Sequence, residues 1–223
     1  MTASLATRLR RHVERLAGEI GERHVLRPAA LQAAERYVGE ALHALGFDVN
    51  RQNYEAQGVD CANLEVVIEG GTRATEIVLA GAHYDTVPGS PGADNNASGV
   101  AAVLELARLL RDAKPARTLR LVAFVSNVRS RRALRSVVDA FRAASDFPAQ
   151  KLAAPALVPG IGWSDQLSFW REGYPAAMVT DTAFHRYRHY HQPTDTPEKL
   201  DYARMASVVD GLAGALQALA MER

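Results

Sequence analysis

Residues 76–110 read EIVLAGAHYDTVPGSPGADNNASGVAAVLELARLL, and this stretch decides the fold. It opens with a nearly continuous apolar run at 76–82, which is typical of a central strand covered on both faces. A loop rich in glycine and proline follows, and the small and apolar residues of 97–110 then predict a helix that packs closely on a sheet. His83 and Asp85 stand where the strand ends, the edge at which α/β sheets collect their functional groups.

The rest of the chain alternates predicted helices and strands. Apolar residues at helical spacing predict helices over 4–20, 28–45, 131–144 and 197–219. Strands are predicted over 47–54, 63–69, 118–124 and 174–180. This alternation predicts an α/β fold, a three-layer α/β/α sandwich around a central mixed, largely parallel sheet. No repeat or low-complexity linker interrupts the sequence, so residues 1–223 are predicted to form a single domain.

Composition narrows the range of partners and compartments. The 26 basic and 25 acidic residues leave a formal net charge of +1, which argues against nucleic acid as the partner. The first twenty residues contain no long apolar segment, so neither a signal peptide nor a membrane span is expected. Cys61 is the only cysteine, which excludes an intramolecular disulfide and predicts a cytoplasmic protein.

Four stretches carry a resemblance to a known family. They are GAHYDTVPGSPGADNNASGVAAVLELARLL at 81–110, TLRLVAF at 118–124, GIGWSDQLSFW at 160–170 and YHQPTDTPEKL at 190–200. In this order they resemble the di-zinc aminopeptidase family, which includes bacterial leucyl aminopeptidases and has the glutaminyl cyclases as relatives. The resemblance covers most of the chain from residue 76 onward. It implies a zinc-dependent hydrolase that releases N-terminal residues from peptides or acts on related small amides.

The resemblance also implies roles for particular residues. His83 matches the first zinc ligand of the family, Asp85 the acid that orients it, and His191 the last ligand. Asp165 and Tyr190 match positions where the substrate is expected to bind. Neutral imidazoles and carboxylates suit zinc, and a bridging carboxylate can hold two ions that clamp an attacking water.

Three departures set this chain apart from the family. The bridging acid should be the second residue of the acidic pair, but that position is Asn95, whose neutral amide is a poor bridge between two dications. A Glu-Glu pair and a further acid should follow TLRLVAF, yet no acid stands between Asp112 and Asp139, as though a segment had been excised. Gln166 occupies a position where the family often has histidine.

The departures predict a shortened relative whose aminopeptidase activity is lost or severely impaired. The general base, the bridging acid and a further acid ligand are all missing. His83, His191 and Asp94 could still hold one zinc ion at reduced occupancy, because three ligands and a water are the usual minimum at a catalytic zinc. The alternative is a non-catalytic module that binds metal or peptide, or that forms a homodimer through a sheet edge exposed by the shortening.

Several of these residues have plainer interpretations. Asp94 and Asn96 could cap the helix over 97–110, and Asp195 could begin the final helix. Two further histidines, His185 and His189, are expected to be mostly solvated. The same holds for a run of arginines predicted to line a solvated helix face, which comprises Arg129, Arg131, Arg132 and Arg135.

Overall fold

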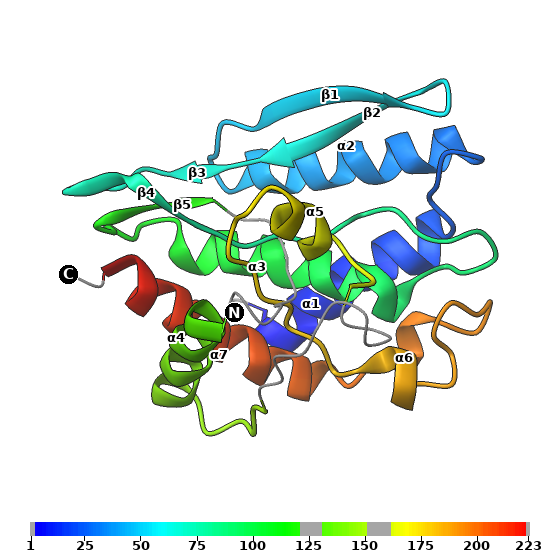
Figure 1. Ribbon diagram of the computed structural model, residues 1–223. Coiled ribbons are helices and arrows are strands. Elements are labelled where there is room, and N and C mark those ends of the chain that lie inside the picture. Colours follow the sequence, from blue (N-terminus) through cyan, green and yellow to red (C-terminus); the bar gives the residue numbers. More distant parts are fainter. Residues whose placement is uncertain (1–2, 121–130, 151–161, 222–223) are drawn as a thin grey trace.

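The N-terminal part of the chain forms three consecutive helical segments. A computed structural model describes residues 3–120, 131–150 and 162–221 (Figure 1). Helix α1 (Leu5–Val13) continues into the π-helical segment η1 (Glu14–Ile20), which confirms the helix predicted over 4–20. The Ser4 hydroxyl accepts a hydrogen bond from the Thr7 N–H and caps α1. Helix α2 (Pro28–Ala44) begins with a proline and is followed by Gly46 at a φ of 87°, so this prediction is also confirmed.

The described strands form two sheets. Strands β1 (Asn50–Ala56) and β2 (Val59–Glu65) make an antiparallel ribbon beside α2 (Figure 1). The second sheet has the order β3-β5-β4 and is mixed, as predicted. In it β3 (Val67–Ile68) is antiparallel to β5 (Arg117–Arg120), and β4 (Arg73–Leu79) is parallel to β5. The strand predicted over 63–69 is therefore divided between the two sheets, and residues 121–124 of the strand predicted over 118–124 lie outside the described residues.

Strand β4 does not have the place in the sheet that its apolar sequence predicted. Among the described strands β5 is central and β4 lies at the edge. Glu76 is exposed and the Ile77 side chain is 51% exposed, so β4 is not covered on both faces. An apolar run specifies that a strand forms, but its neighbours come from residues distant in the sequence.

The late strand predicted over 174–180 is wrong for the described part of the chain. Residues 174–180 take no strand conformation and pair with none of the described strands. Tyr174 and Val179 remain 64% and 57% exposed. A strand is stable only when a neighbouring strand accepts and donates its backbone hydrogen bonds, and apolar side chains alone do not supply that neighbour.

Helices α3 (Gly99–Leu110) and α7 (Tyr202–Met221) pack against each other and against α1, and α7 also contacts β4 and β5. Helix α4 (Arg131–Ala144) packs on α7. The main core joins these helices to the sheet and contains Leu9, Leu104, Leu119 and Val209, each at most 2% exposed. Burying a side chain of this size stabilises the fold by about 2 kcal/mol. The α/β class is as predicted.

Short elements connect the larger ones. The segment η2 (Ala93–Ser98) leads into α3, while α5 (Gln166–Arg171) and α6 (Ala183–Arg186) precede the short 3-10 helix η4 (Pro197–Lys199) that introduces α7. A small second cluster gathers Trp170 and Ala176 beside α5. Within residues 3–120, 131–150 and 162–221, no helix combines the length and the apolar character needed to cross a membrane.

Candidate functional site

The loop after β4 presents the first two predicted site residues as a hydrogen-bonded pair. The Nδ1 atom of His83 lies 3.0 Å from Oδ1 of Asp85. Burial alone would lower the pKa of His83, but the hydrogen bond to Asp85 and the charges of Asp85 and Asp165 together outweigh burial and raise the pKa. The same hydrogen bond lowers the pKa of Asp85, although burial opposes the change. With Nδ1–H donated to a carboxylate, Nε2 becomes the ring atom suited to bind a ligand, as in carboxylate-oriented metal ligands.

The turn at Gly92–Ser98 carries the next two predicted site residues, Asp94 and Asn95. Gly92 has a φ of 63°, and an added Cβ would lie 2.5 Å from a carbonyl oxygen of the same turn. Glycine is therefore required at this position. Asn96 confirms its predicted capping role, because its Oδ1 accepts the N–H of Gly99, the first residue of α3, at 3.2 Å. Asp94 contributes its backbone carbonyl to the turn, accepting the Ser98 hydroxyl at 2.7 Å.

Asp195 holds this turn from the other end of the chain. Its side chain is fully buried, with Oδ1 accepting the Asp94 N–H at 2.9 Å and Oδ2 accepting the Asn95 N–H at 3.3 Å. The Tyr187 hydroxyl donates to Oδ1 at 3.1 Å. The sequence suggested only that Asp195 could begin the final helix. Instead it fixes the backbone on which the two predicted site residues stand, and its place in the YHQPTDTPEKL motif was the one signal for this role.

Asn95 and His191 meet across the site although they lie 96 positions apart in the sequence. The Asn95 Nδ2 is 3.1 Å from His191 Nε2, so the amide donates to the ring nitrogen. The Tyr190 ring stacks on the His191 ring, with centroids 3.9 Å apart and an angle of 17° between the planes. His191 has a φ of 58°, in the left-handed region that costs a residue with a side chain about 1 kcal/mol. The Nε2 lone pair that a metal would need is thus engaged by the amide.

Several carboxylates lie around this pair, and their charges change one another's pKa. Burial, and then the charges of Asp181 and Asp195, raise the pKa of Asp94 to about 7. Burial also raises the pKa of Asp165, with His83 opposing the shift and Asp85 adding to it. These charge effects place Asp165 near the His83 pair and Asp181 near Asp94. Burial lowers the pKa of His191, Asp195 opposes this, and His83 lowers it further, so both histidines face the same region.

Arg23 lies beneath the site and was not found from the sequence. Its side chain is fully buried and donates to five backbone carbonyls at 2.7–3.1 Å, those of Leu16, Gly21, Tyr84, Pro91 and Gly92. Its backbone N–H donates to the Thr86 hydroxyl, and its carbonyl accepts the Thr86 N–H. Burial lowers the pKa of Arg23 to about 10, while the charges of Asp85 and Asp195 oppose this. One cation therefore ties the end of η1 to both site loops.

The described residues do not gather into a metal centre. No group of three or more His, Cys, Asp or Glu side chains within the described ranges is placed to hold a metal ion. Of the three predicted ligands, His191 is bonded to Asn95, and Asp94 lies among other acids. The residues present therefore do not fit a two-metal centre, and zinc binding by His83, His191 and Asp94 stays a prediction.

The plainer interpretations also have outcomes. His185 is exposed, as expected, whereas His189 is half-buried, with its Nδ1 at 2.7 Å from the Thr194 hydroxyl. Arg135 is exposed on α4, as predicted. Arg129 lies outside the described residues, as do the side chains of Arg131 and Arg132.

Comparisons with known proteins show the family. The model of peptidase family M28 matches residues 63–126 and 128–216, more than half of the chain. The chain therefore belongs to peptidase family M28. Its relatives include the uncharacterized protein YfbL of Escherichia coli (strain K12), 28% identical over 255 residues that take in 82% of this chain and 78% of YfbL.

Solved structures confirm the fold class. The zinc aminopeptidase BSAP from Bacillus subtilis superposes with a TM-score of 0.78 at 14% identity, covering 98% of this chain and 95% of that one. The glutaminyl cyclase of Fimbriiglobus ruber gives a TM-score of 0.74 at 17% identity, covering 97% and 96%. At such identities the likeness shows the fold alone. The chain is a short version of the M28 fold and a relative of zinc aminopeptidases.

The family match is interrupted at one place in the chain. The family match breaks between residues 126 and 128, close behind the TLRLVAF stretch where the sequence lacks its expected acids. The alignment with YfbL spans 255 positions, more than the 223 residues of this chain, so it opens gaps in this chain. The family match therefore breaks in the same stretch where the sequence predicted the excised segment.

Proposed function

We propose that this chain is a shortened M28 peptidase relative whose release of N-terminal residues from peptides is lost or severely impaired. One observation carries the proposal: the amide of Asn95, at the bridging-acid position, donates to His191 Nε2 at 3.1 Å. In an active two-metal site a carboxylate at this position would bridge the ions, and the histidine nitrogen would bind one of them. In this structure the Asn95 amide and the His191 ring are instead hydrogen-bonded to each other.

The two halves of the site support the proposal in different ways. The His83–Asp85 pair keeps a ligand arrangement, with a carboxylate fixing the ring at 3.0 Å. The other half has an amide in place of an acid, and no acid occurs in the sequence between Asp112 and Asp139 to serve as general base. A missing general base costs about 10²–10⁴ in rate. No catalytic step through zinc follows from these residues.

Zinc content is the first test. Purified protein is dialysed against zinc buffer, then against metal-free buffer, and its zinc is measured by elemental analysis. We expect less than about a tenth of an equivalent in the wild type, because three ligands are not assembled. Asn95→Asp restores a carboxylate beside His191 and is expected to raise the zinc content. Asp48→Asn, on an exposed residue before β1, is the matched control and should leave it unchanged.

Turnover of aminoacyl-nitroanilides is the second test. We expect none above background in the wild type, and none in Asn95→Asp, since the general base is still missing. Turnover that zinc stimulates and that His83→Ala abolishes, while the exposed-histidine control His43→Ala retains it, would contradict the proposal. Turnover that survives His83→Ala would come from a contaminant.

A non-catalytic assembly role is the second candidate, and the exposed edge of β4 favours it. Among the described strands β4 pairs on one side only, and Ile77 on it is 51% exposed. An open apolar edge is suited to pairing with a second copy of the chain. Light scattering should then report a dimer that Ile77→Lys dissociates. Val179→Lys changes an equally exposed apolar residue outside β4 and should leave the dimer intact.

A further inference from the structure

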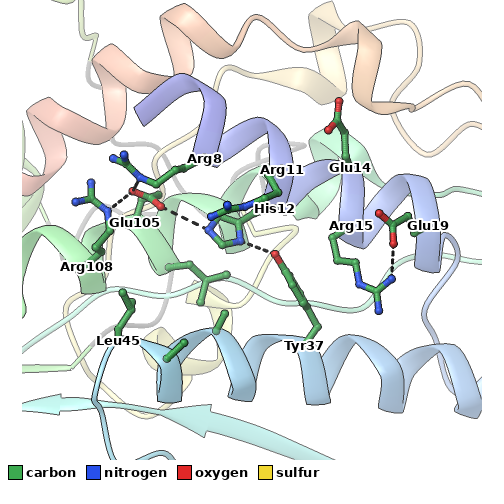
Figure 2. A pocket seen from close by; sticks show the side chains of 13 residues that line it. Arg8, Arg11, His12, Glu14, Arg15, Glu19, Tyr37, Leu45, Glu105 and Arg108 are labelled. Atoms are coloured by element: carbon green, nitrogen blue, oxygen red, sulfur yellow. Dashed lines mark hydrogen bonds and ion pairs between the residues drawn. The ribbon is translucent and has the colours of Figure 1, made fainter. Parts of the chain in front are cut away.

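A cavity far from the predicted site opens between the first three helices. It has a volume of about 450 Å³, and its lining comes from α1 and η1, from α2, and from α3. Figure 2 shows the polar side chains that line it, with His12 of α1 and Tyr37 of α2 pointing toward each other. Cavities of 300–1,000 Å³ are the usual size for small-molecule sites. None of the predicted site residues lines this cavity.

The carboxylates at this cavity are already neutralised or turned away. The Glu105 side chain accepts from Arg8 at 2.8 Å and from Arg108 at 2.6 Å. Glu19 pairs with Arg15. Glu14 points away from the other polar groups in Figure 2, and it adds to the effect of burial in raising the pKa of Tyr202 on α7 to about 12. A cationic ligand would therefore find no free carboxylate among these residues.

Two further arginines line the cavity. Arg11 and Arg15 stand one helical turn apart, so they share a face of the helix. Within the described residues Arg11 has no carboxylate partner, and the Arg15 guanidinium lies 5.9 Å from the centre of the Tyr37 ring. Burial raises the pKa of Tyr37, while the charges of Arg11 and Arg15 oppose the shift.

The Tyr37 hydroxyl is held in position by His12, which in turn contacts Glu105. It lies 2.6 Å from Nδ1 of the buried His12, whose Nε2 is 3.5 Å from Glu105. These contacts fix the Tyr37 phenol at the cavity, where its oxygen can form a hydrogen bond with a ligand. Beyond the polar groups the lining becomes apolar, with Ala41 and Leu45 of α2 facing Leu104 of α3.

We propose that this cavity binds a small amphipathic monoanion, a short-chain carboxylate. Its carboxylate would accept charge-assisted hydrogen bonds from Arg11, which has no carboxylate partner among the described residues, beside the Tyr37 hydroxyl. Its hydrocarbon chain would cover Ala41, Leu45 and Leu104. The proposal is independent of the function proposed above, because no predicted site residue lines the cavity.

Hexanoate is the probe, titrated into the metal-free protein and followed by amide shifts in NMR. Hexylammonium and 1-hexanol have the same chain with a cationic and a neutral head. We expect saturable binding of hexanoate, about tenfold tighter than that of either analogue, with shifts confined to the first three helices. Equal affinities for the three compounds, or no saturable binding of hexanoate, would overturn the proposal.

Two variants separate charge from shape. Arg11→Ala is expected to weaken hexanoate about tenfold. Arg10→Ala is the matched control, because Arg10 lies over the Tyr202 ring at 4.7 Å and does not line the cavity. This variant should bind hexanoate with the affinity of the wild type. Ala41→Phe fills the apolar end without changing charge and should abolish binding. Unchanged affinity in Arg11→Ala or in Ala41→Phe would refute the assignment.

Discussion

Glu105 and Asp94 are both largely withdrawn from solvent, but their surroundings have opposite character. Glu105 is 2% exposed and has three cationic or imidazole partners, and these lower its pKa to about 2 although burial opposes the change. Asp94 is half-buried, and burial together with Asp181 and Asp195 raises its pKa to about 7. Glu105 therefore stabilises the helical part of the fold, whereas Asp94 destabilises the turn that carries it. This electrostatic destabilisation lies in the turn that matches the metal-binding loop of the family.

Arg23 gives the largest expected effect, because its buried guanidinium donates to the backbone of both site loops. Arg23→Met should lower the free energy of unfolding by about 4 kcal/mol, since five backbone carbonyls lose the donor that the buried side chain supplies. Urea unfolding measures the change. Arg27→Met, on an exposed neighbour, should stay within about 0.5 kcal/mol. A loss below 1 kcal/mol for Arg23→Met would mean that water replaces the arginine.

The Glu105 cluster gives the next largest effect. Glu105→Gln keeps the size of the side chain but removes the charge that Arg8 and Arg108 share, and it should cost about 2–3 kcal/mol in urea unfolding. Glu14→Gln, the control, changes an exposed carboxylate of η1 and should cost less than about 0.5 kcal/mol. Equal effects of the two substitutions would mean that the ion pairs of Glu105 do not stabilise the fold.

The two carboxylates should also respond to pH in opposite directions. The pKa of Glu105 is lowered in the folded state, so its stabilisation is complete above the unfolded value near 4.5 and is lost as pH falls toward 2. We expect the wild type to lose on the order of 2 kcal/mol over this window, and Glu105→Gln to lose less. Urea unfolding at several pH values measures both. Parallel curves for the two proteins would contradict the assignment.

Asp94 gives the smallest effect and the opposite sign. Its pKa is raised in the folded state, so the folded form is favoured below the unfolded value of 3.8 and loses stability as pH rises toward 7. Asp94→Asn should therefore stabilise the protein by about 1–2 kcal/mol at pH 8 and by less at pH 5. Thermal unfolding at both pH values measures this. A destabilised variant at pH 8 would show that the Asp94 charge has a cationic partner.

Local patterns explain which predictions were confirmed. The helices over 4–20 and 28–45 have apolar spacing, a serine cap and a terminal glycine within their own residues, and they formed nearly as predicted. The His83–Asp85 pair spans three residues of one strand end, so the sequence could place it. The edge position of β4 among the described strands was missed, as was the lack of pairing between 174–180 and those strands, since pairing depends on distant parts of the sequence.

The sequence by itself determined the family, the α/β class and the missing acids, because these follow from residue types at fixed spacing. Only the tertiary structure decided that the Asn95 amide occupies His191 Nε2, that Asp195 supports the turn, and that Arg23 joins both loops. Asp195 and Arg23 act on residues about 60–100 positions away in the sequence. Contacts over such distances form only when the core brings their elements together, and no local pattern encodes them.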